Sequence, residues 1–302
     1  MKKYALLLAL ALAAGFAQAQ ATPQVSVYGK VREYQESYTL GSANSLTRLT
    51  NDSSRLGFRA TADVGNGITA SAVIETGVAL DAPSATTLGD RISVFSLSNS
   101  IGSVGVGRDK HSVTRVLDNF DVMENAYGTF ATTIHSAQGS RLQNAVFLST
   151  ATVAGFKGNY VMANSETAGV TNVQTASIDY AAGPVAATLA RYDSSTNSAS
   201  TILGAKYTVA KTGTTLFGMY SDDTVSGVST TGKSVGIRQE INSQVAVLGG
   251  YGETNAGVTA KAIGVAYAMS KALTVHGRWT NIDNVGSATD VTQYGVGVEY
   301  NF

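Results

Sequence analysis

The sequence contains no cysteine, only three prolines and one tryptophan, and no long uninterrupted hydrophobic run beyond its first 20 residues. The absence of cysteine excludes a disulfide framework and thiolate chemistry. Without an apolar run of about 20 residues, no later segment is expected to cross a membrane as a helix. Glycine (32 residues) and tyrosine (14) are abundant, and the mean hydropathy is +0.06. This composition favours strands that have one polar and one apolar face.

The first residues predict an export signal. Lys2 and Lys3 precede an apolar segment from Leu6 to Ala14, and Ala17-Gln18-Ala19 has the small-residue pattern of a cleavage site. We expect residues 1–19 to be a signal peptide and 20–302 to form one domain, although Ala19-Gln20-Ala21 fits a cut two residues later. The apolar segment is too short for a membrane anchor.

The charge of the remaining chain is nearly balanced. Removal of Lys2 and Lys3 leaves 19 basic residues against 21 acidic ones, a net charge of −2. A slightly acidic chain without basic runs does not favour nucleic-acid binding.

The last residues of the chain alternate strictly in character. Tyr294, Val296, Val298, Tyr300 and Phe302 share one parity, and small or polar residues lie between them. Successive side chains of a strand point to opposite faces, so this segment predicts a strand with one apolar face. An aromatic-tipped apolar face is typical of a transmembrane β-barrel, whose strands contact lipid outside and water inside.

Similar segments recur along the chain and are separated by turn residues. We predict an all-β antiparallel barrel of about sixteen strands, because only helices and closed barrels satisfy the backbone in lipid. A soluble β-sandwich or β-helix is the alternative fold. The predicted strands are Val25–Tyr38, Ser53–Asp63, Ile68–Thr76, Asp90–Asn99, Ser103–Lys110, Arg141–Thr150, Phe156–Ser165, Gln174–Tyr180, Pro184–Asp193, Ser200–Tyr207, Gly213–Asp222, Gly232–Glu240, Gln244–Glu253, Thr259–Ala268, Ala272–Asp283 and Val291–Phe302.

Parity also predicts which charged residues face the lumen. Arg278 alternates with Leu273, Val275 and Trp279, and Arg238 alternates with Val235 and Ile237. An arginine on the lipid face at mid-membrane costs about 2–4 kcal/mol, so both are expected inside. Tight turns such as Val64-Gly-Asn-Gly67 are expected at one end of the barrel and longer polar loops at the other.

The segment between Lys110 and Arg141 lacks strand alternation. Asp118, Asp121 and Glu124 are interleaved there with apolar residues, which a solvated loop would not need. A loop of this length is usually functional when it is ordered. We therefore expect it to fold into the lumen, with its apolar residues on the barrel wall and its carboxylates toward water.

The ordered series of motifs resembles the β-proteobacterial general diffusion porins, the Gram-negative trimeric porin family that includes the neisserial porins. The resemblance covers nearly the whole mature chain, although the loops look short and the usual third-loop sequence is replaced. It rests on Val25-Ser-Val-Tyr-Gly29, Ser54-Arg-Leu-Gly-Phe58, Glu75-Thr-Gly77, Gly105-Val-Gly-Arg108, Ser140-Arg-Leu-Gln-Asn144, Gly155-Phe156 and the terminal Tyr300-Asn-Phe302.

The resemblance implies a homotrimer of sixteen-stranded barrels in the cell outer membrane, multi-pass, with passive diffusion of small hydrophilic solutes and ions. A third loop would narrow each pore, its acids Asp118, Asp121 and Glu124 facing a ladder of arginines. That ladder falls on Arg55, Arg91 and Arg141, with Arg59 and Arg108 as further candidates. With five arginines against three acids, we expect a mild preference for anions. Phe302, Tyr300 and Val298 would form the signal for the outer-membrane barrel assembly machinery.

Other chemistry is poorly supported. Gly227-Val-Ser-Thr-Thr-Gly-Lys-Ser234 matches a P-loop pattern, but a strand follows it where phosphate binding needs a helix. His111, His135 and His276 lack metal-ligand spacing, and we expect no metal, no cofactor and no enzyme activity. A substrate-selective channel is the alternative function. A barrel hydrolase that uses His276 is a less favoured one.

Overall fold

The computed structural model describes residues 22–82, 87–135, 140–168, 170, 172–194, 198–284 and 289–302. The expected signal peptide lies outside these residues. The strands are β1 (Gln24–Leu40), β2 (Leu46–Asn51), β3 (Arg55–Asp63), β4 (Thr69–Gly77), β5 (Ile92–Asn99), β6 (Gly102–Lys110), β7 (Arg141–Thr150), β8 (Phe156–Ala163), β9 (Val173–Ala182), β10 (Val185–Ser194), β11 (Ser198–Val209), β12 (Thr214–Val225), β13 (Val228–Glu240), β14 (Val245–Thr254), β15 (Val258–Ala268), β16 (Leu273–Asn284) and β17 (Val291–Asn301).

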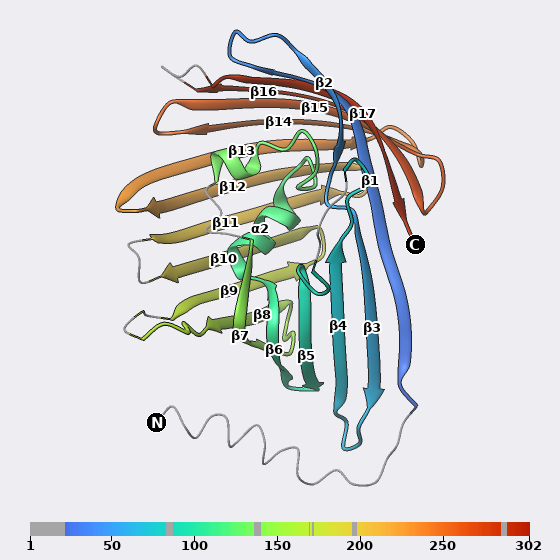
Figure 1. Ribbon diagram of the computed structural model, residues 1–302, viewed down its shortest axis with the longest axis vertical. Coiled ribbons are helices and arrows are strands. Elements are labelled where there is room, and N and C mark those ends of the chain that lie inside the picture. The colour runs from blue at the N-terminus through green and yellow to red at the C-terminus, as the bar shows by residue number, and fades with distance from the viewer. Residues whose placement is uncertain are drawn as a thin grey trace.

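These strands form one closed antiparallel sheet. Consecutive strands pair with one another from β3 to β17, and β1 pairs with β17 to close the barrel (Figure 1). Both β2 and β3 pair with β1, so they are two parts of one span that is interrupted at residues 52–54. The seventeen strands therefore make sixteen spans, which confirms the predicted fold class.

The alternation of faces is as the sequence predicts. Tyr294 and Val296 of β17 are exposed on the outside, whereas His276 and Arg278 of β16 are buried inside. In β13, Val235 and Ile237 point outward, and Arg238 meets a residue of the loop inside the barrel. Apolar side chains therefore form an outer band, and charged side chains such as Arg238 and Arg278 line the lumen. The alternation is interrupted where β6 shifts register between Gly107 and Asp109.

The two ends of the barrel differ less in the length of their connections than the sequence predicts. One end, called the turn end here, carries the C-terminal Phe302 and the short turns, including Val64-Gly-Asn-Gly67. At the other end, the loop end, β12 and β13 are joined by only Ser226 and Gly227, at φ angles of 51° and 83°. A two-residue turn with both φ values positive is the favoured hairpin connection. Gly227 to Ser234 thus belongs to a hairpin, and no helix follows it.

The long connection after β6 does enter the barrel, as predicted, but it contains two helices that the sequence analysis did not anticipate. The inner loop, residues 111–135, comprises α2 (Ser112–Phe120), a short α3 (Ala131–Ile134) and turns between them. Within the described residues no helix is long and apolar enough to span a membrane. The buried residues of α2 recur at three- and four-residue spacing, so its apolar side faces the wall.

One substitution tests the orientation of the wall. Leu203, in the middle of β11, is exposed on the outer face. We expect Leu203→Arg to lower the free energy of unfolding in lipid by about 2–4 kcal/mol, because the charge would face hydrocarbon. Urea titration of barrels refolded in phospholipid vesicles measures this. Thr208→Arg is the control on the same strand, since Thr208 shares a face with the lumen residue Lys206. Equal losses in both variants would contradict the assigned faces.

Candidate functional site: the lumen and its inner loop

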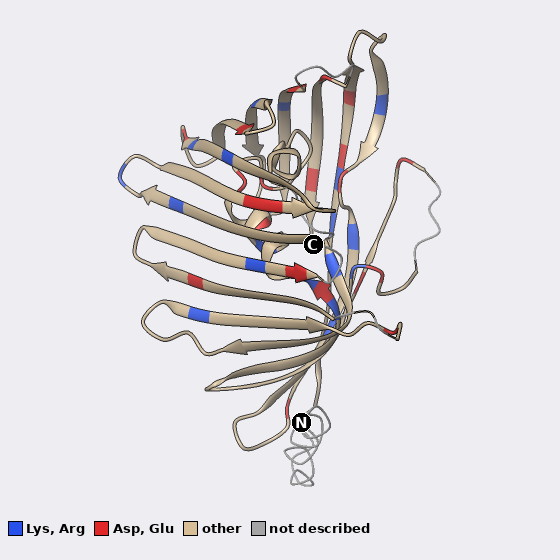
Figure 2. Ribbon diagram, turned by 90° about the vertical axis from the view of Figure 1, so that its left-hand side faces the viewer, with Lys and Arg blue, Asp and Glu red and all other residues tan. Residues whose placement is uncertain are grey.

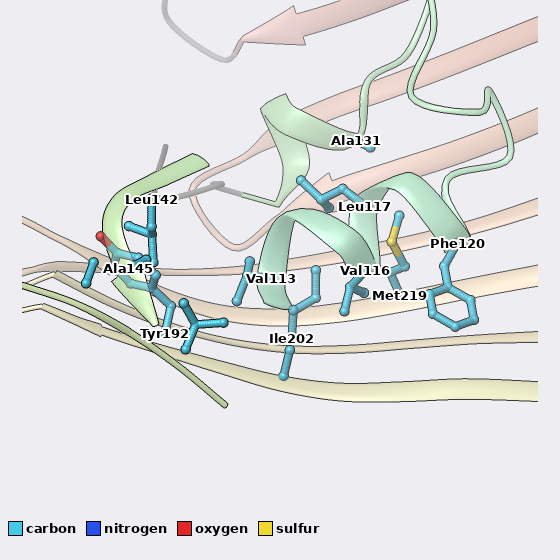
Figure 3. Packing of buried hydrophobic residues seen from close by; sticks show 13 residues of the cluster. Val113, Val116, Leu117, Phe120, Ala131, Leu142, Ala145, Tyr192, Ile202 and Met219 are labelled. Carbon is cyan, nitrogen blue, oxygen red and sulfur yellow. The ribbon is translucent and has the colours of Figure 1, made fainter. Parts of the chain in front are cut away.

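The helix α2 lies flat against the inner wall, across β9 to β12 (Figure 3). Val116 and Phe120 pack against Ile202 and Met219, and all four side chains are buried. Gly204 of β11 allows this approach, because a Cβ atom there would lie 2.4 Å from the Phe120 ring. One half of the inner loop is therefore held by close apolar packing.

The second half of the inner loop packs on β13 to β15 in the same manner. Val122, Phe130 and Ile134 form a second buried cluster with wall residues that include Leu248. Gly236 leaves the space for this contact, since a Cβ atom there would lie 2.5 Å from Val122. The loop thus follows the wall around the lumen and does not hang freely in it.

Polar contacts fix the middle of the inner loop to β13 and β16. Glu124 accepts hydrogen bonds from Arg238 Nη1 at 2.6 Å and from Arg278 Nη2 at 3.4 Å. Arg278 Nη1 also donates to the carbonyl of Met123 at 3.3 Å. Arg278 is only 4% exposed, so Glu124 balances a charge that would otherwise be isolated inside the protein.

The last described residue of the inner loop, His135, sits between two strands. Its Nδ1 lies 2.9 Å from Ser221 Oγ of β12, and its Nε2 lies 2.8 Å from Ser234 Oγ of β13. The ring is 1% exposed, and burial lowers the pKa of His135 to about 4. A neutral imidazole therefore joins the end of the loop to the wall.

The three acids proposed from the sequence have different surroundings. Asp118 accepts from Lys110 Nζ at 2.6 Å and from Asn125 Nδ2 at 2.7 Å, and Glu124 meets Arg238 and Arg278. Asp121 is only 3% exposed, and its carboxylate accepts from the Met123 and Asn125 amides and the Thr129 hydroxyl. Burial raises the pKa of Asp121, against the lowering effect of these donors. Asp121 therefore organises the loop and does not face the pore water.

Two of the proposed arginines meet at one carboxylate on the part of the wall that the inner loop leaves free. Arg91 Nε lies 2.8 Å from Glu75, and Arg55 Nε lies 3.6 Å from it. Tyr28 donates to the same carboxylate at 3.2 Å. Glu75 is buried, so two guanidinium groups share one acid and leave an excess of positive charge.

Arg141 extends this basic wall to β7, but Arg108, which was expected in it, lies elsewhere. Arg108 pairs with Ser93 on the face where Val106 pairs with the exposed Phe95, so its side chain lies on the outer face. Arg108 donates to the carbonyl of Asp90 at 2.7 Å and to Gln143 at 3.1 Å, both uncharged acceptors. Arg141 lies within electrostatic reach of Arg91 and of the shared acid Glu75. Within the described residues, neither Arg108 nor Arg141 has a carboxylate within 4.0 Å. Arg59 is separate, because its guanidinium stacks over the Tyr28 ring at 5.7 Å.

Several lumen charges that complete the wall were not predicted from the sequence. Lys30 and Arg32 of β1 contact Glu299 of β17 at 3.0 and 3.1 Å, and Arg32 also pairs with Asp52 at 2.9 Å. Their shared parity in β1 would have revealed Lys30 and Arg32. In Figure 2, basic and acidic segments lie close together on the strands around the C-terminus. The lumen is therefore a field of paired charges with a local basic excess.

Comparison with known proteins agrees with this architecture. A family model described as Gram-negative porin matches residues 5–302. The chain belongs to the Gram-negative porin family. It is an outer-membrane β-barrel through which small hydrophilic solutes and ions diffuse passively. No curated protein sequence matches it.

Several solved porin structures share the fold at low sequence identity. An anion-selective porin from Comamonas acidovorans is 20% identical and has a TM-score of 0.82, with 93% of this chain and 100% of that chain covered. OmpF of Salmonella typhi, in complex with daunomycin, is 15% identical with a TM-score of 0.75, covering 92% and 97%. A triple mutant of the Rhodopseudomonas blastica porin is 18% identical with a TM-score of 0.73, covering 92% and 100%.

The burial of His135 between two wall serines predicts that the stability of the inner loop depends on pH. The pKa of His135 is about 4 in the folded porin and about 6.5 in an unfolded chain. The folded state therefore binds fewer protons, so the contribution of His135 to stability is complete above about pH 6.5 and is lost as the pH falls towards 4. At pH 5 the contribution of His135 to the stability of the folded loop should be about 2 kcal/mol smaller than above pH 6.5.

Hydrogen exchange of the α3 amides at pH 7.5 and pH 5, corrected for intrinsic rates, measures this effect. Protection should fall at the lower pH in the native porin. In His135→Asn, which cannot titrate, protection should be lower at pH 7.5 and should not change further. The same pH dependence in both proteins would show that another group is responsible.

Proposed function

We propose that the inner loop narrows the water-filled lumen of this porin and that the arginine wall gives the pore a mild preference for anions. The loop covers the inner faces of β9 to β16, and the basic residues of β3 to β7 lie on the part that remains free. Solutes then pass between a loop surface and a basic wall. Fixed charges at a constriction select ions by the sign of their charge.

The observation that supports anion preference is an imbalance in pairing. Asp118 and Glu124 of the loop each have a basic partner, which neutralises much of their field. On the lumen wall, Arg59 stacks over the Tyr28 ring and Arg141 donates to the Ser140 hydroxyl, so neither has a carboxylate partner in the described part of the chain. The similar Comamonas porin is itself anion-selective, which supports the same preference here.

The remaining proposals concern export and assembly. Residues 1–19 would act as a cleaved signal peptide, and the porin would associate as a homotrimer. Phe302, Tyr300 and Val298 would be recognised by the outer-membrane barrel assembly machinery. In the folded chain the Phe302 amide donates to the Gly29 carbonyl at 3.1 Å, so the terminal residue takes part in barrel closure.

A barrel hydrolase gains no support from the surroundings of His276. Its Nδ1 lies 3.4 Å from Arg278 Nη2, and no nucleophilic hydroxyl contacts the ring among the described residues. Nucleophilic catalysis requires such a hydroxyl within hydrogen-bond reach of the base.

The first test is the conductance of refolded porin in a planar bilayer. A steady conductance that appears in steps of three would support a trimer of open pores. If well-folded barrels show no conductance, the proposed pore is wrong.

Selectivity is tested by the double variant Arg59→Gln, Arg141→Gln. Removal of two lumen charges that have no carboxylate partner should lower the anion-to-cation permeability ratio by about two-fold or more, since fixed charges set this ratio. The reversal potential across a KCl gradient measures it. Arg191→Gln is the control, because Arg191 pairs with Asp193 on the exposed outer face and should leave the ratio unchanged. A native porin that prefers cations would contradict the proposed preference.

A further inference from the structure

A separate pocket opens from the lumen beside the inner loop, at the turn end of β13 to β17. Its volume is about 230 Å³. Glu124 of the inner loop lies on one side and Glu299 of β17 on another, and alanines of β14 and β15 line it between them. One water needs about 10–15 Å³ of such space, so the pocket has room for a small solute.

The charged groups of this pocket largely neutralise one another. Arg238 donates to both Glu124 and Glu240, each at 2.6 Å. Glu299 is balanced by Lys30 at 3.0 Å and Arg32 at 3.1 Å. Within the described residues, no group of acids and histidines has an arrangement that could hold a metal ion. The pocket therefore offers carboxylate acceptors without a strong field for a counter-ion.

Uncharged polar residues complete the lining. Ser243, Gln244 and Thr274 lie in the pocket among the charged groups, and their hydroxyl and amide groups both donate and accept hydrogen bonds. His276 also belongs to the lining, but its Nε2 is enclosed by protein atoms and does not reach the pocket.

We propose that this pocket binds a small neutral polyol next to the constriction. A hydroxyl group both donates and accepts, so a polyol can donate to the glutamates and accept from Ser243, Gln244 and Thr274. A carboxylate solute would meet three glutamates, and an ammonium would meet Arg238 and could not accept from the donors of the lining. The proposal rests on the passive pore proposed above and makes that pore saturable for one class of solute.

Current through single porins in fixed KCl, at increasing xylitol, tests the proposal. Binding beside the constriction should reduce the current in a saturable way, in addition to the fall in bulk conductivity. Ala268→Leu should abolish the saturable part, because Ala268 lines the pocket and a larger side chain fills it. Thr208→Leu is the control on the lumen face of β11, outside the pocket, and should retain it.

Thr274→Val, which keeps the size of the side chain and removes a hydroxyl group of the lining, should weaken the saturable block by several-fold. Lactate and ethanolammonium, tested in the same way, should give none. If Ala268→Leu does not refold, Gln244→Leu replaces it, since Gln244 also lines the pocket. A native current that only follows bulk conductivity would overturn polyol binding while leaving the pore established. A saturable, Ala268-dependent block by lactate or ethanolammonium in place of xylitol would overturn the assigned class.

Discussion

The shape of the lumen depends on one interaction, the packing of the inner loop against glycine positions of the barrel wall. Where Phe120 and Val122 approach, the wall presents Gly204 and Gly236, so side chain meets backbone with no Cβ between them. Interiors packed at this density resist deformation. The width of the lumen is therefore set mainly by apolar contact, and the ion pairs of Glu124 secure a loop that the wall already positions.

Strand alternation is the second constraint, and it determines where charge can lie. A side chain of a span faces either hydrocarbon or the lumen, and a charge at mid-membrane on the lipid side is costly. Charges such as Arg55, Arg91 and Arg278 therefore gather inside a narrow space. There each buried charge needs a partner, and Glu75 and Glu299 each serve two basic groups. The basic excess arises because bases outnumber the acids within reach on β3 to β7.

Alternation also explains how much the sequence could reveal. It placed Arg238, Arg278 and the terminal strand on their correct faces, since parity is a local property. It did not resolve β2 as part of an interrupted span, because a break at residues 52–54 shifts the parity. The helix α2 was missed even though Val113, Val116, Leu117 and Phe120 have helical spacing. Asp121 could not be distinguished from Asp118 or Glu124, because its donors come from a turn whose shape only tertiary packing defines.

In that turn, one acid stabilises the fold of the loop and a different acid faces the lumen. Between the two apolar clusters, Glu124 and Asn125 adopt φ angles of 63° and 46°, a left-handed conformation that costs about 1–2 kcal/mol per residue. The buried Asp121 carboxylate offsets this cost by accepting from the Met123 and Asn125 amides, one on each side of Glu124. Held in this conformation, the turn directs the Glu124 side chain toward Arg238 and Arg278. Glu124 thereby forms one side of the pocket. The position of Glu124, at the edge of the pocket, thus depends on a buried acid that does not face the pore water.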